Sequence, residues 1–227
     1  MKGTVIKTYI WNQDTKSIFI QSEKRINFIP GQFMMVGLET NGKLEKRAFS
    51  ICNTPDEEHV EITFKRFAEG KLSPKLFDLK EGDELIIEGP YGNFRLNFED
   101  KNAVLIAGGT GIAPLMSMIR YNKYHNWPMH LTVFYSAKNP SNILYRQELE
   151  RYHMEKRIHF IPISQDNSQV PNGFITGRVT NELITSHVKN MTEQSFYLCG
   201  PPKMITEIEA ELRKSGIEKQ RIKTDKW

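Results

Sequence analysis

The sequence predicts two successive units of different class, an all-β unit followed by an α/β unit with a parallel sheet. Up to about residue 95, short runs rich in β-branched and aromatic residues are separated by turn signals such as Pro30-Gly31 and Asn41-Gly42. After residue 102, continuous apolar runs alternate with segments of helical pattern, which is typical of a parallel sheet covered on both faces. We place the boundary near residue 100, giving one domain over residues 1–99 and a second over residues 100–227.

The turn signals divide the first half into short strands. The expected strands are residues 4–6, 17–20, 32–36, 60–64 and 84–87, with one short helix over residues 73–79. Short strands at regular spacing indicate a β-barrel or a β-sandwich.

The second half alternates strands with helices. The expected strands are residues 103–106, 130–135, 158–163, 195–199 and 221–224. The first expected helix begins after the glycines at 108–111 and ends near residue 124. Three further helices are expected over residues 144–156, 179–189 and 202–215. No internal repeat interrupts this order.

Composition excludes several classes of protein. Hydrophobic residues make up 39% of the 227 residues and charged residues 26%, which excludes wholesale disorder and a coiled coil. The longest mostly apolar stretch, residues 103–116, is too short to span a bilayer, and residues 1–20 show no secretory pattern. We therefore expect no membrane span. The net charge is only +4, and basic residues alternate with acidic ones along the chain, so we expect no nucleic-acid partner either.

The metal-ligating residue types are sparse. Cys52 and Cys199 are the only cysteines, too few for a four-cysteine zinc site or iron–sulfur cluster within this chain. Two free thiols fit a reducing cytoplasm. The six histidines, at positions 59, 125, 130, 153, 159 and 187, show no metal-ligand spacing. Since His153 falls on an expected helix and His159 on the next strand, we expect no shared metal.

A glycine-rich turn follows the first strand of the second half. The run Gly108-Gly109-Thr110-Gly111 joins a buried strand to a helix, with Pro114 inside that helix. Glycines let the backbone approach a ligand, and a helix N-terminus offers N–H groups to a pyrophosphate. The pattern lacks the final glycine of the usual dinucleotide fingerprint. It predicts a nucleotide site, with a tight turn that binds nothing as the alternative.

A second motif lies in the β-rich half. In Arg47-Ala48-Phe49-Ser50, the guanidinium suits a phosphate, the ring offers a flat face and the hydroxyl can bond a heteroatom. The run Gly70-Lys71-Leu72-Ser73 precedes the expected short helix, whose free N–H groups form a second anion site. Taken alone, the first motif also describes an ordinary strand with an exposed arginine and a core phenylalanine.

A third motif is Cys199-Gly200-Pro201-Pro202, again at a strand-to-helix turn. A thiol at the carboxyl end of a parallel strand lies where α/β sheets bind ligands. The alternative is a small buried apolar cysteine.

Taken in order, with Gly-Pro-Tyr-Gly-Asn-Phe at 89–94, these motifs resemble the ferredoxin–NADP reductase-like flavoprotein family across residues 4–227. The resemblance implies a six-stranded antiparallel β-barrel that binds flavin, FAD rather than FMN, followed by an α/β domain that binds NADH or NADPH. The implied activity takes hydride onto bound FAD and passes single electrons to a separate ferredoxin, flavodoxin or oxygenase component. Two alternatives stay open: a reductase of free flavin, and an electron-transfer subunit of a larger complex. A monomer is the default.

The resemblance also assigns the flavin residues. Arg47 would meet the flavin pyrophosphate, Phe49 would stack on the isoalloxazine ring and Ser50 would lie near flavin N5. Thr63 and Lys65 would line the ribityl and adenosine side. The hydroxyl and backbone of the 71–73 segment would bond the phosphates. The full flavin set is Arg47, Ala48, Phe49, Ser50, Thr63, Phe64, Lys65, Gly70, Lys71, Leu72 and Ser73.

The nucleotide residues follow in the same way. Thr110 would lie near the nicotinamide, Gly109 and Gly111 at its pyrophosphate, and Cys199 would face the nicotinamide during hydride transfer. The full set adds Pro114, Ser136, Ser164, Gly200, Pro201 and Trp227, and the catalytic set is Ser50, Thr110, Cys199 and Trp227.

Some positions depart from the family pattern or leave a choice open. Phe49 stands where the family usually has tyrosine, so stacking survives and one hydroxyl bond is lost. Trp227 either covers the flavin face or caps a domain edge. After the third strand, Asp166 would repel the 2′-phosphate of NADPH, although Lys138 can compensate from the neighbouring loop. We therefore expect NADH to be slightly favoured.

Overall fold

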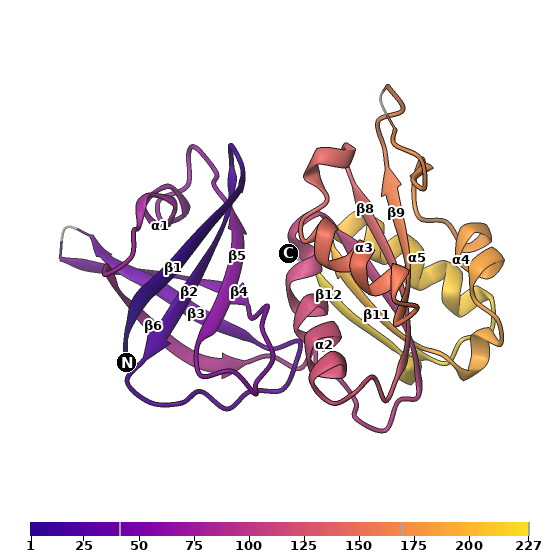
Figure 1. Cartoon of the computed structure of the whole chain (residues 1–227), viewed down its shortest axis with the longest axis horizontal. Helices are drawn as coiled ribbons and strands as arrows, with labels where there is room; N and C mark the ends of the chain where they lie inside the picture. The colour runs from indigo at the N-terminus through magenta and orange to yellow at the C-terminus, as the bar shows by residue number, and fades with distance from the viewer. Residues whose placement is uncertain (41, 169, 227) are drawn as a thin grey trace. The chain divides into compact units, whose positions relative to one another are not determined.

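A computed structural model of the chain describes residues 1–40, 42–168 and 170–226. They form two compact units, Met1–Leu96 with Met116–Tyr124, and Asn97–Leu115 with the remainder from His125. The first contains most of the strands drawn in indigo to magenta in Figure 1, and the second contains the parallel sheet and its helices.

The first unit is a six-stranded antiparallel sheet that closes on itself. Its strands are β1 (Lys2–Asn12), β2 (Thr15–Ser22), β3 (Phe33–Thr40), β4 (Lys43–Ser50), β5 (Val60–Lys65) and β6 (Glu84–Tyr91), in the spatial order β4-β3-β6-β1-β2-β5 (Figure 1). An antiparallel bridge between Ile51 and Ile62 joins the two edge strands just past the end of β4. The predicted six-stranded antiparallel barrel is confirmed.

Strand β4 was not among the strands read from alternation. Its first five residues, Lys43-Leu44-Glu45-Lys46-Arg47, carry four charges, so no apolar period marks it. The strand is held by eight residue pairs with β3, from Phe33↔Ser50 to Thr40↔Lys43. Backbone pairing, which the side-chain pattern does not encode, forms this strand.

The core of the barrel comes from alternate positions of its strands. Ile18 and Ile20 of β2 and Met34 and Val36 of β3 are fully buried, and burial of each such side chain stabilises the fold by about 1.5–3 kcal/mol. The helix α1 (Ser73–Asp78) adds Leu76 to the same cluster.

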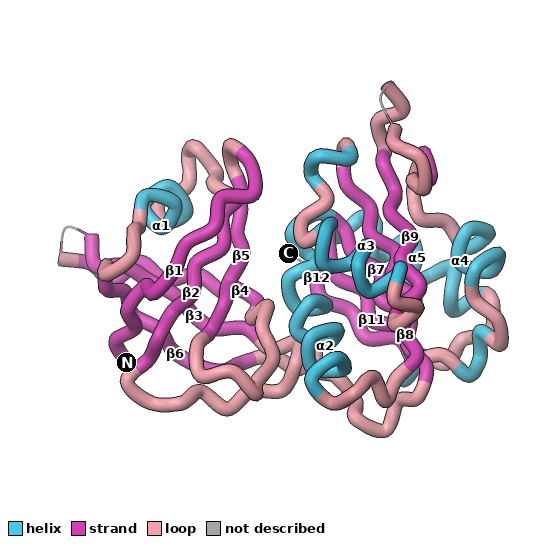
Figure 2. Tube along the Cα trace, viewed as in Figure 1, coloured by secondary structure: helices cyan, strands magenta, loops and turns pink. Residues whose placement is uncertain are grey.

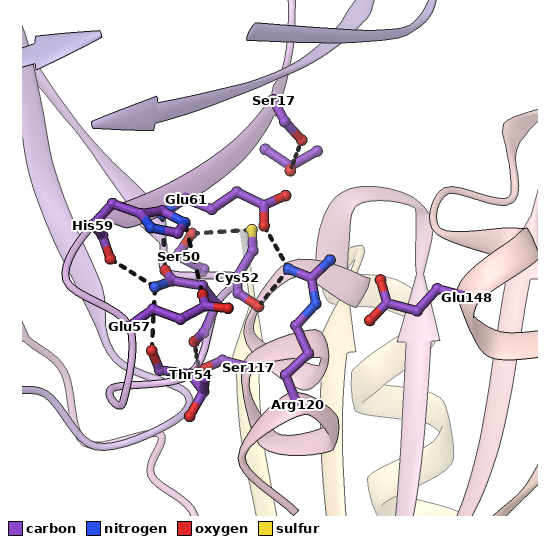
Figure 3. A network of polar contacts seen from close by, with 12 residues as sticks. Ser17, Ser50, Cys52, Thr54, Glu57, His59, Glu61, Ser117, Arg120 and Glu148 are labelled. Carbon is purple, nitrogen blue, oxygen red and sulfur yellow. Dashed lines mark hydrogen bonds and ion pairs between the residues drawn. The ribbon is translucent and has the colours of Figure 1, made fainter. Parts of the chain in front are cut away.

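A buried polar network fixes the segment that follows β4 (Figure 3). Arg120, in the part of α2 (Ile112–Tyr124) that belongs to the first unit, pairs with Glu61 at 2.5 Å. Its guanidinium also donates to the carbonyl of Cys52 at 3.2 Å. The Glu61 N–H donates to the Asn53 side-chain oxygen at 2.8 Å, and the Ser117 hydroxyl donates to the Asn53 carbonyl at 2.7 Å. Since Glu61 is only 2% exposed, its charge depends on this pairing.

The second unit is a six-stranded parallel sheet. Its strands are β7 (Asn102–Gly108), β8 (His130–Ala137), β9 (Ile158–Ser164), β10 (Ile175–Thr176), β11 (Ser195–Gly200) and β12 (Ile222–Lys226), in the order β10-β9-β8-β7-β11-β12. Each neighbouring pair is parallel, which confirms the predicted parallel-sheet α/β domain. Short 3₁₀ turns lie at Gly109–Gly111 (η1), Pro140–Asn142, Met191–Glu193 and Lys219–Arg221.

Helices cover both faces of this sheet (Figure 2). The helices α4 (Asn181–His187) and α5 (Pro202–Lys214) pack on one face, in a core that includes Val104, Ile106 and Phe134. On α3 (Arg146–Met154), Leu149 is buried, and the Leu144 N–H just before the helix donates to the Tyr135 hydroxyl.

Two helices are shorter than predicted. The helix expected over 144–156 begins at Arg146, because Tyr145 has a left-handed backbone with φ of 55°. The helix expected over 179–189 begins at Asn181, where the Thr180 hydroxyl caps the Leu183 N–H, and it ends at His187.

The two-residue strand β10 was not predicted, since two residues leave no periodic signal. Among the described residues, none of the helices has the length and apolar character that crossing a bilayer needs.

The Arg120–Glu61 pair gives a stability prediction. Replacing Arg120→Leu removes the guanidinium that pairs with the buried Glu61 carboxylate, and we expect a loss of about 3–5 kcal/mol in the free energy of unfolding. The double variant Glu61→Leu/Arg120→Leu buries no unpaired charge and should recover most of that loss. Urea unfolding measures both.

The matched control is Lys2→Gln, which breaks the exposed Lys2–Glu84 pair of 2.8 Å. It should leave the unfolding midpoint unchanged, because exposed ion pairs contribute little. A double variant as unstable as Arg120→Leu would show that packing, and not charge, sets the stability of this network.

Candidate functional site

The Arg47 to Ser50 segment occupies the end of β4. Arg47 pairs with Val36 in the ladder, and its exposed side chain donates to the Lys46 carbonyl at 2.8 Å. Within the described residues this guanidinium has no carboxylate partner, so its charge is available to an anion. Ala48 is exposed and Ser50 is half-buried.

Phe49 presents part of its ring outside the core. The side chain is half-buried, and its ring centroid lies 5.5 Å from that of Phe64 at an interplanar angle of 61°. Because Phe64 is only 3% exposed, Phe49 makes this edge contact with a ring that belongs to the core. A half-exposed ring held by a buried one is suited to stacking.

The other residues predicted on β5 lie in two environments. Thr63 is 4% exposed and shares a hydrogen bond with the Ser17 hydroxyl inside the barrel. Lys65 is exposed and pairs with Asp14 at 2.9 Å. The structure therefore does not bring the Thr63 and Lys65 side chains together.

The Gly70 to Ser73 segment forms a locked turn. The Ser73 hydroxyl accepts the Phe67 N–H at 3.0 Å, and the Gly70 N–H donates to the Phe67 carbonyl at 2.9 Å. A Cβ on Gly70 would lie 2.9 Å from the Ser73 Oγ. Leu72 is buried in the barrel core, whereas Lys71 is exposed. The turn thus leaves one cationic side chain in solvent beside a fixed backbone.

In the second unit, the glycine motif lies where the strand order reverses. After β7 the chain moves to β8 on one side and later returns to β11 on the other, and open α/β sheets bind ligands at this switch point. Ala107 and Cys199 are register partners, and a Cβ on Gly200 would lie 3.0 Å from the Gly108 nitrogen.

The turn η1 presses against the end of β11. A Cβ on Gly111 would lie 2.5 Å from the Cys199 carbonyl carbon and 2.8 Å from the Gly200 nitrogen, so only glycine fits. Gly109 has a left-handed φ of 55°. Internal packing therefore demands these glycines, and it holds the start of α2, with buried Pro114 and half-buried Thr110, at the carboxyl end of the sheet.

Ser136 and Ser164 lie at the carboxyl ends of the neighbouring strands β8 and β9. Both side chains are buried; the Ser164 hydroxyl donates to the Asp166 carbonyl at 2.7 Å, and the Gln165 amide donates to the Ser136 hydroxyl at 3.4 Å. The exposed Asp166 carboxylate accepts the Ser168 N–H at 2.9 Å. Hydrogen bonds from Ser168 lower the pKa of Asp166, and the charge of Lys138 lowers this pKa further.

Cys199 is paired with a residue that lies outside its own motif. Its side chain is 1% exposed, and its Sγ lies 3.9 Å from an oxygen of Asp225, its register partner on β12. Burial raises the pKa of the Cys199 thiol well above its ordinary value, and the Asp225 carboxylate raises it further. Burial also raises the pKa of Asp225. Only the β11–β12 register reveals this pair.

The remaining predicted residues can be placed briefly. Pro201 is exposed, and its carbonyl accepts the Ile205 N–H of α5 at 3.1 Å. Trp227 lies outside the described residues. Within those residues, no group of three or more histidine, cysteine, aspartate or glutamate side chains is arranged to hold a metal ion.

The donors in each unit fit a phosphate-bearing ligand. The first unit offers two exposed cations, Arg47 and Lys71, and a half-exposed ring at Phe49, which suit the pyrophosphate and ring of a flavin dinucleotide. The second offers a glycine turn and a helix start at a switch point, which suits the pyrophosphate of a nicotinamide dinucleotide.

The buried thiol leads to a labelling prediction. In a Cys52→Ala variant, Cys199 is the single thiol, and we expect iodoacetamide to label the native protein at least about 100-fold more slowly than the unfolded chain, because the reactive thiolate is suppressed. Mass spectrometry at mildly alkaline pH follows the reaction. Labelling at the rate of a free thiol would mean that this site opens readily.

Comparisons with known proteins agree with both halves. Residues 3–96 match the model of the oxidoreductase FAD-binding domain, and residues 105–210 match that of the oxidoreductase NAD-binding domain. The chain is 30% identical over 224 residues to a glycine betaine monooxygenase reductase subunit of Pseudomonas aeruginosa, covering 95% of this chain and 58% of that protein. It is 32% identical over 206 residues to an NADH-cytochrome b5 reductase 1 of Lodderomyces elongisporus, covering 86% and 66%.

The fold comparison extends over the whole chain. A ferredoxin NADP+ reductase from Neisseria gonorrhoeae, solved with bound FAD and NADP, matches with a TM-score of 0.88 at 19% identity, covering 100% of this chain and 98% of that one. The chain spans less than two thirds of the length of the two curated relatives above. With an FAD-binding barrel followed by an NAD-binding parallel sheet, it belongs to the ferredoxin–NADP reductase-like family of flavoproteins.

Proposed function

We propose that this chain takes hydride from NADH or NADPH onto FAD and passes the electrons one at a time to a separate carrier, such as a ferredoxin, a flavodoxin or an oxygenase component. The observation that carries the proposal is the presence, in one chain, of an FAD-type donor set in the barrel and a dinucleotide-type turn at the sheet switch point. FAD, when bound, supplies a centre that accepts a hydride and releases single electrons.

In this proposal the barrel, with residues 1–99 as its domain, binds and orients the flavin. Arg47 and Lys71 neutralise its pyrophosphate, since neither cation has a carboxylate partner among the described residues. Phe49 stacks on its ring, and Ser50 offers a hydroxyl beside that ring. The network behind β4 keeps these side chains in place, because Cys52 and Asn53 are bonded within it.

The second domain, residues 100–227, binds the nicotinamide dinucleotide in this proposal. Gly109 and Gly111 bring the backbone of the turn close to the pyrophosphate, and the start of α2 donates N–H groups. Thr110 stands at the exposed part of that turn. Cys199 is a neutral buried thiol beside Asp225, so in this proposal it lies at the end of β11 next to the nicotinamide site and takes no part as a nucleophile.

We favour NADH over NADPH. The Asp166 carboxylate is exposed, ionised and fixed by Ser168 just past β9, where it would repel a 2′-phosphate and accept hydrogen bonds from a ribose diol. Lys138 lies close enough to act on Asp166, which weakens the repulsion and makes the preference modest.

The proposed partner and compartment rest on two further observations. One relative carries the name of a monooxygenase reductase subunit, so we propose an oxygenase component as the first acceptor to try. Both cysteines are buried free thiols, which supports a reducing compartment, the cytoplasm.

The experiment that tests the function is the visible spectrum of the purified chain, before and after anaerobic addition of NADH or NADPH. We expect a tightly held flavin whose absorbance bleaches with both nucleotides and faster with NADH. A colourless protein that turns over only added flavin would identify a free-flavin reductase instead. A colourless protein with no turnover would contradict the proposal.

Phe49 gives a separate test of the flavin site. Phe49→Ala removes the proposed stacking ring and should raise the dissociation constant for FAD by about 2- to 10-fold, because stacking contributes about 0.5–1.5 kcal/mol beyond area burial. Quenching of flavin fluorescence measures the constant.

The matched variant Phe49→Tyr keeps an aromatic ring and restores the hydroxyl, so it should bind FAD at least as tightly as the parent does. Circular dichroism of each variant shows whether the barrel is intact. Unchanged FAD affinity in a folded Phe49→Ala protein would remove Phe49 from the flavin site.

A further inference from the structure

Three imidazoles from three elements of the second unit lie in a row. The rings of His153 on α3 and His159 on β9 are stacked, with centroids 5.8 Å apart and planes at 21°. The ring of His187 on α4 lies 5.6 Å from that of His159 at 37°. The spacing of these residues in the sequence gave no reason to expect them together, and the flavin and nucleotide sites do not use them.

An open pocket of about 350 Å³ adjoins two of these rings. His130 is the first residue of β8 and Ile158 the first of β9, so this pocket lies at the amino end of these strands. The glycine turn and Cys199 lie at the carboxyl end of the same sheet. The pocket is therefore separate from the proposed nucleotide site.

Cations and imidazoles line this pocket, and no acid does. Lys156 and Arg157, in the turn after α3, and the rings of His130, His153 and His159 are all exposed. Neither Lys156 nor Arg157 has an ion-pair partner among the described residues, and the neighbouring Glu155 does not line the pocket. The site therefore carries two uncompensated positive charges at neutral pH, in a volume at the low end of small-ligand pockets.

The hydrogen bonds of the imidazoles fix where their protons lie. The Phe160 N–H donates to Nδ1 of His153 at 3.2 Å, so that neutral ring carries its hydrogen on Nε2, where it can donate to a ligand. Nδ1 of His187 lies 3.0 Å from the Leu183 carbonyl and 2.9 Å from the Ser186 hydroxyl. Burial lowers the pKa of His159, and His187 and His153 lower it further.

We propose that this pocket binds a tetrahedral oxyanion, either free phosphate or the phosphate group of a small ester. Lys156 and Arg157 supply the charge that such an anion neutralises, and the three lining imidazoles and the Thr132 hydroxyl supply hydrogen-bond donors around it. The buried apolar residues Leu131 and Ile158 at the base suit the carbon part of an ester.

The same groups make binding depend on pH. Protonating His159 without an anion sets a new positive charge among His130, His153, His187, Lys156 and Arg157. A bound dianion offsets that repulsion and so raises the pKa of the ring relative to the empty pocket. By linkage, affinity for the anion must rise as pH falls through the lowered pKa of His159.

The test uses the full chain and sulfate, which keeps two charges from pH 6 to pH 8. Two-dimensional NMR follows the imidazole Cε1 protons during sulfate titrations at constant ionic strength. We expect saturable shifts of the His153 and His159 signals with a dissociation constant of about 1 mM at the lower pH. Binding should be about tenfold weaker at the higher pH, because the pKa of His159 is lowered and this ring is neutral there.

Charge variants separate this pocket from general electrostatic attraction. Lys156→Gln/Arg157→Gln should weaken sulfate binding at least about tenfold, since it removes both fixed charges. Lys214→Gln/Lys219→Gln removes two exposed charges of the same unit outside the pocket and should leave binding unchanged.

Three ligand arms identify the chemistry. Glycerol phosphate binding more tightly than inorganic phosphate would identify an ester as the ligand, and equal binding would identify the free ion. Succinate binding as well as sulfate would overturn the tetrahedral assignment. Absence of saturable shifts at pH 6, or equal binding by the Lys156→Gln/Arg157→Gln protein, would overturn the site itself. None of these readouts depends on the proposed redox activity.

Discussion

The close approach of the β7–α2 turn to the end of β11 is the constraint on which the second unit depends. Gly111 has no room for a side chain, because the backbone of Cys199 and Gly200 fills the space. The contact joins two strands that are far apart in the sequence and neighbours in the sheet. It fixes the start of α2 at the switch point, where a parallel sheet leaves N–H groups free for an anion. The glycines to which we assign the pyrophosphate are thus also needed for the fold without any ligand.

The first unit depends on a different device, a buried ion pair at the seam of the barrel. The Ile51–Ile62 bridge closes the sheet, and the Glu61–Arg120 pair lies beside it with Cys52 and Asn53 bonded around it. A buried pair of this kind adds little net stability over an apolar pair, but breaking it leaves a charge without a partner. The Glu61–Arg120 pair holds the segment after β4 in one conformation. Because Phe49 and Ser50 directly precede that segment, the pair also helps to fix their positions.

The parallel sheet offers different chemistry at its two ends. At the carboxyl end, Cys199 is buried beside half-buried Asp225, and burial raises the pKa of both groups. At the amino end, Lys156 and Arg157 stand exposed beside a column of imidazoles. The buried thiol suits the hydride transfer that we propose for the carboxyl end, because water is excluded there, whereas the exposed cations suit the oxyanion that we propose for the amino end. The two environments are separated because the strands are parallel: the segments at their carboxyl ends supply the residues of one, and the segments at their amino ends supply those of the other.

The sequence by itself determined the two fold classes, five strands of the barrel, the strand–helix order of the second half and the three motifs, because these depend on local periodicity and on glycine, proline and turn residues. Strand β4 could not be predicted in this way, because its residues are mostly charged and it is a strand through its ladder pairing with β3. Only the tertiary structure joined Arg120 to Glu61, Asp225 to Cys199 and His153 to His159. Each of these contacts joins residues of different elements, and the physical reason is the same in each case: register and packing bring such side chains together, and neither leaves a periodic signal in the chain.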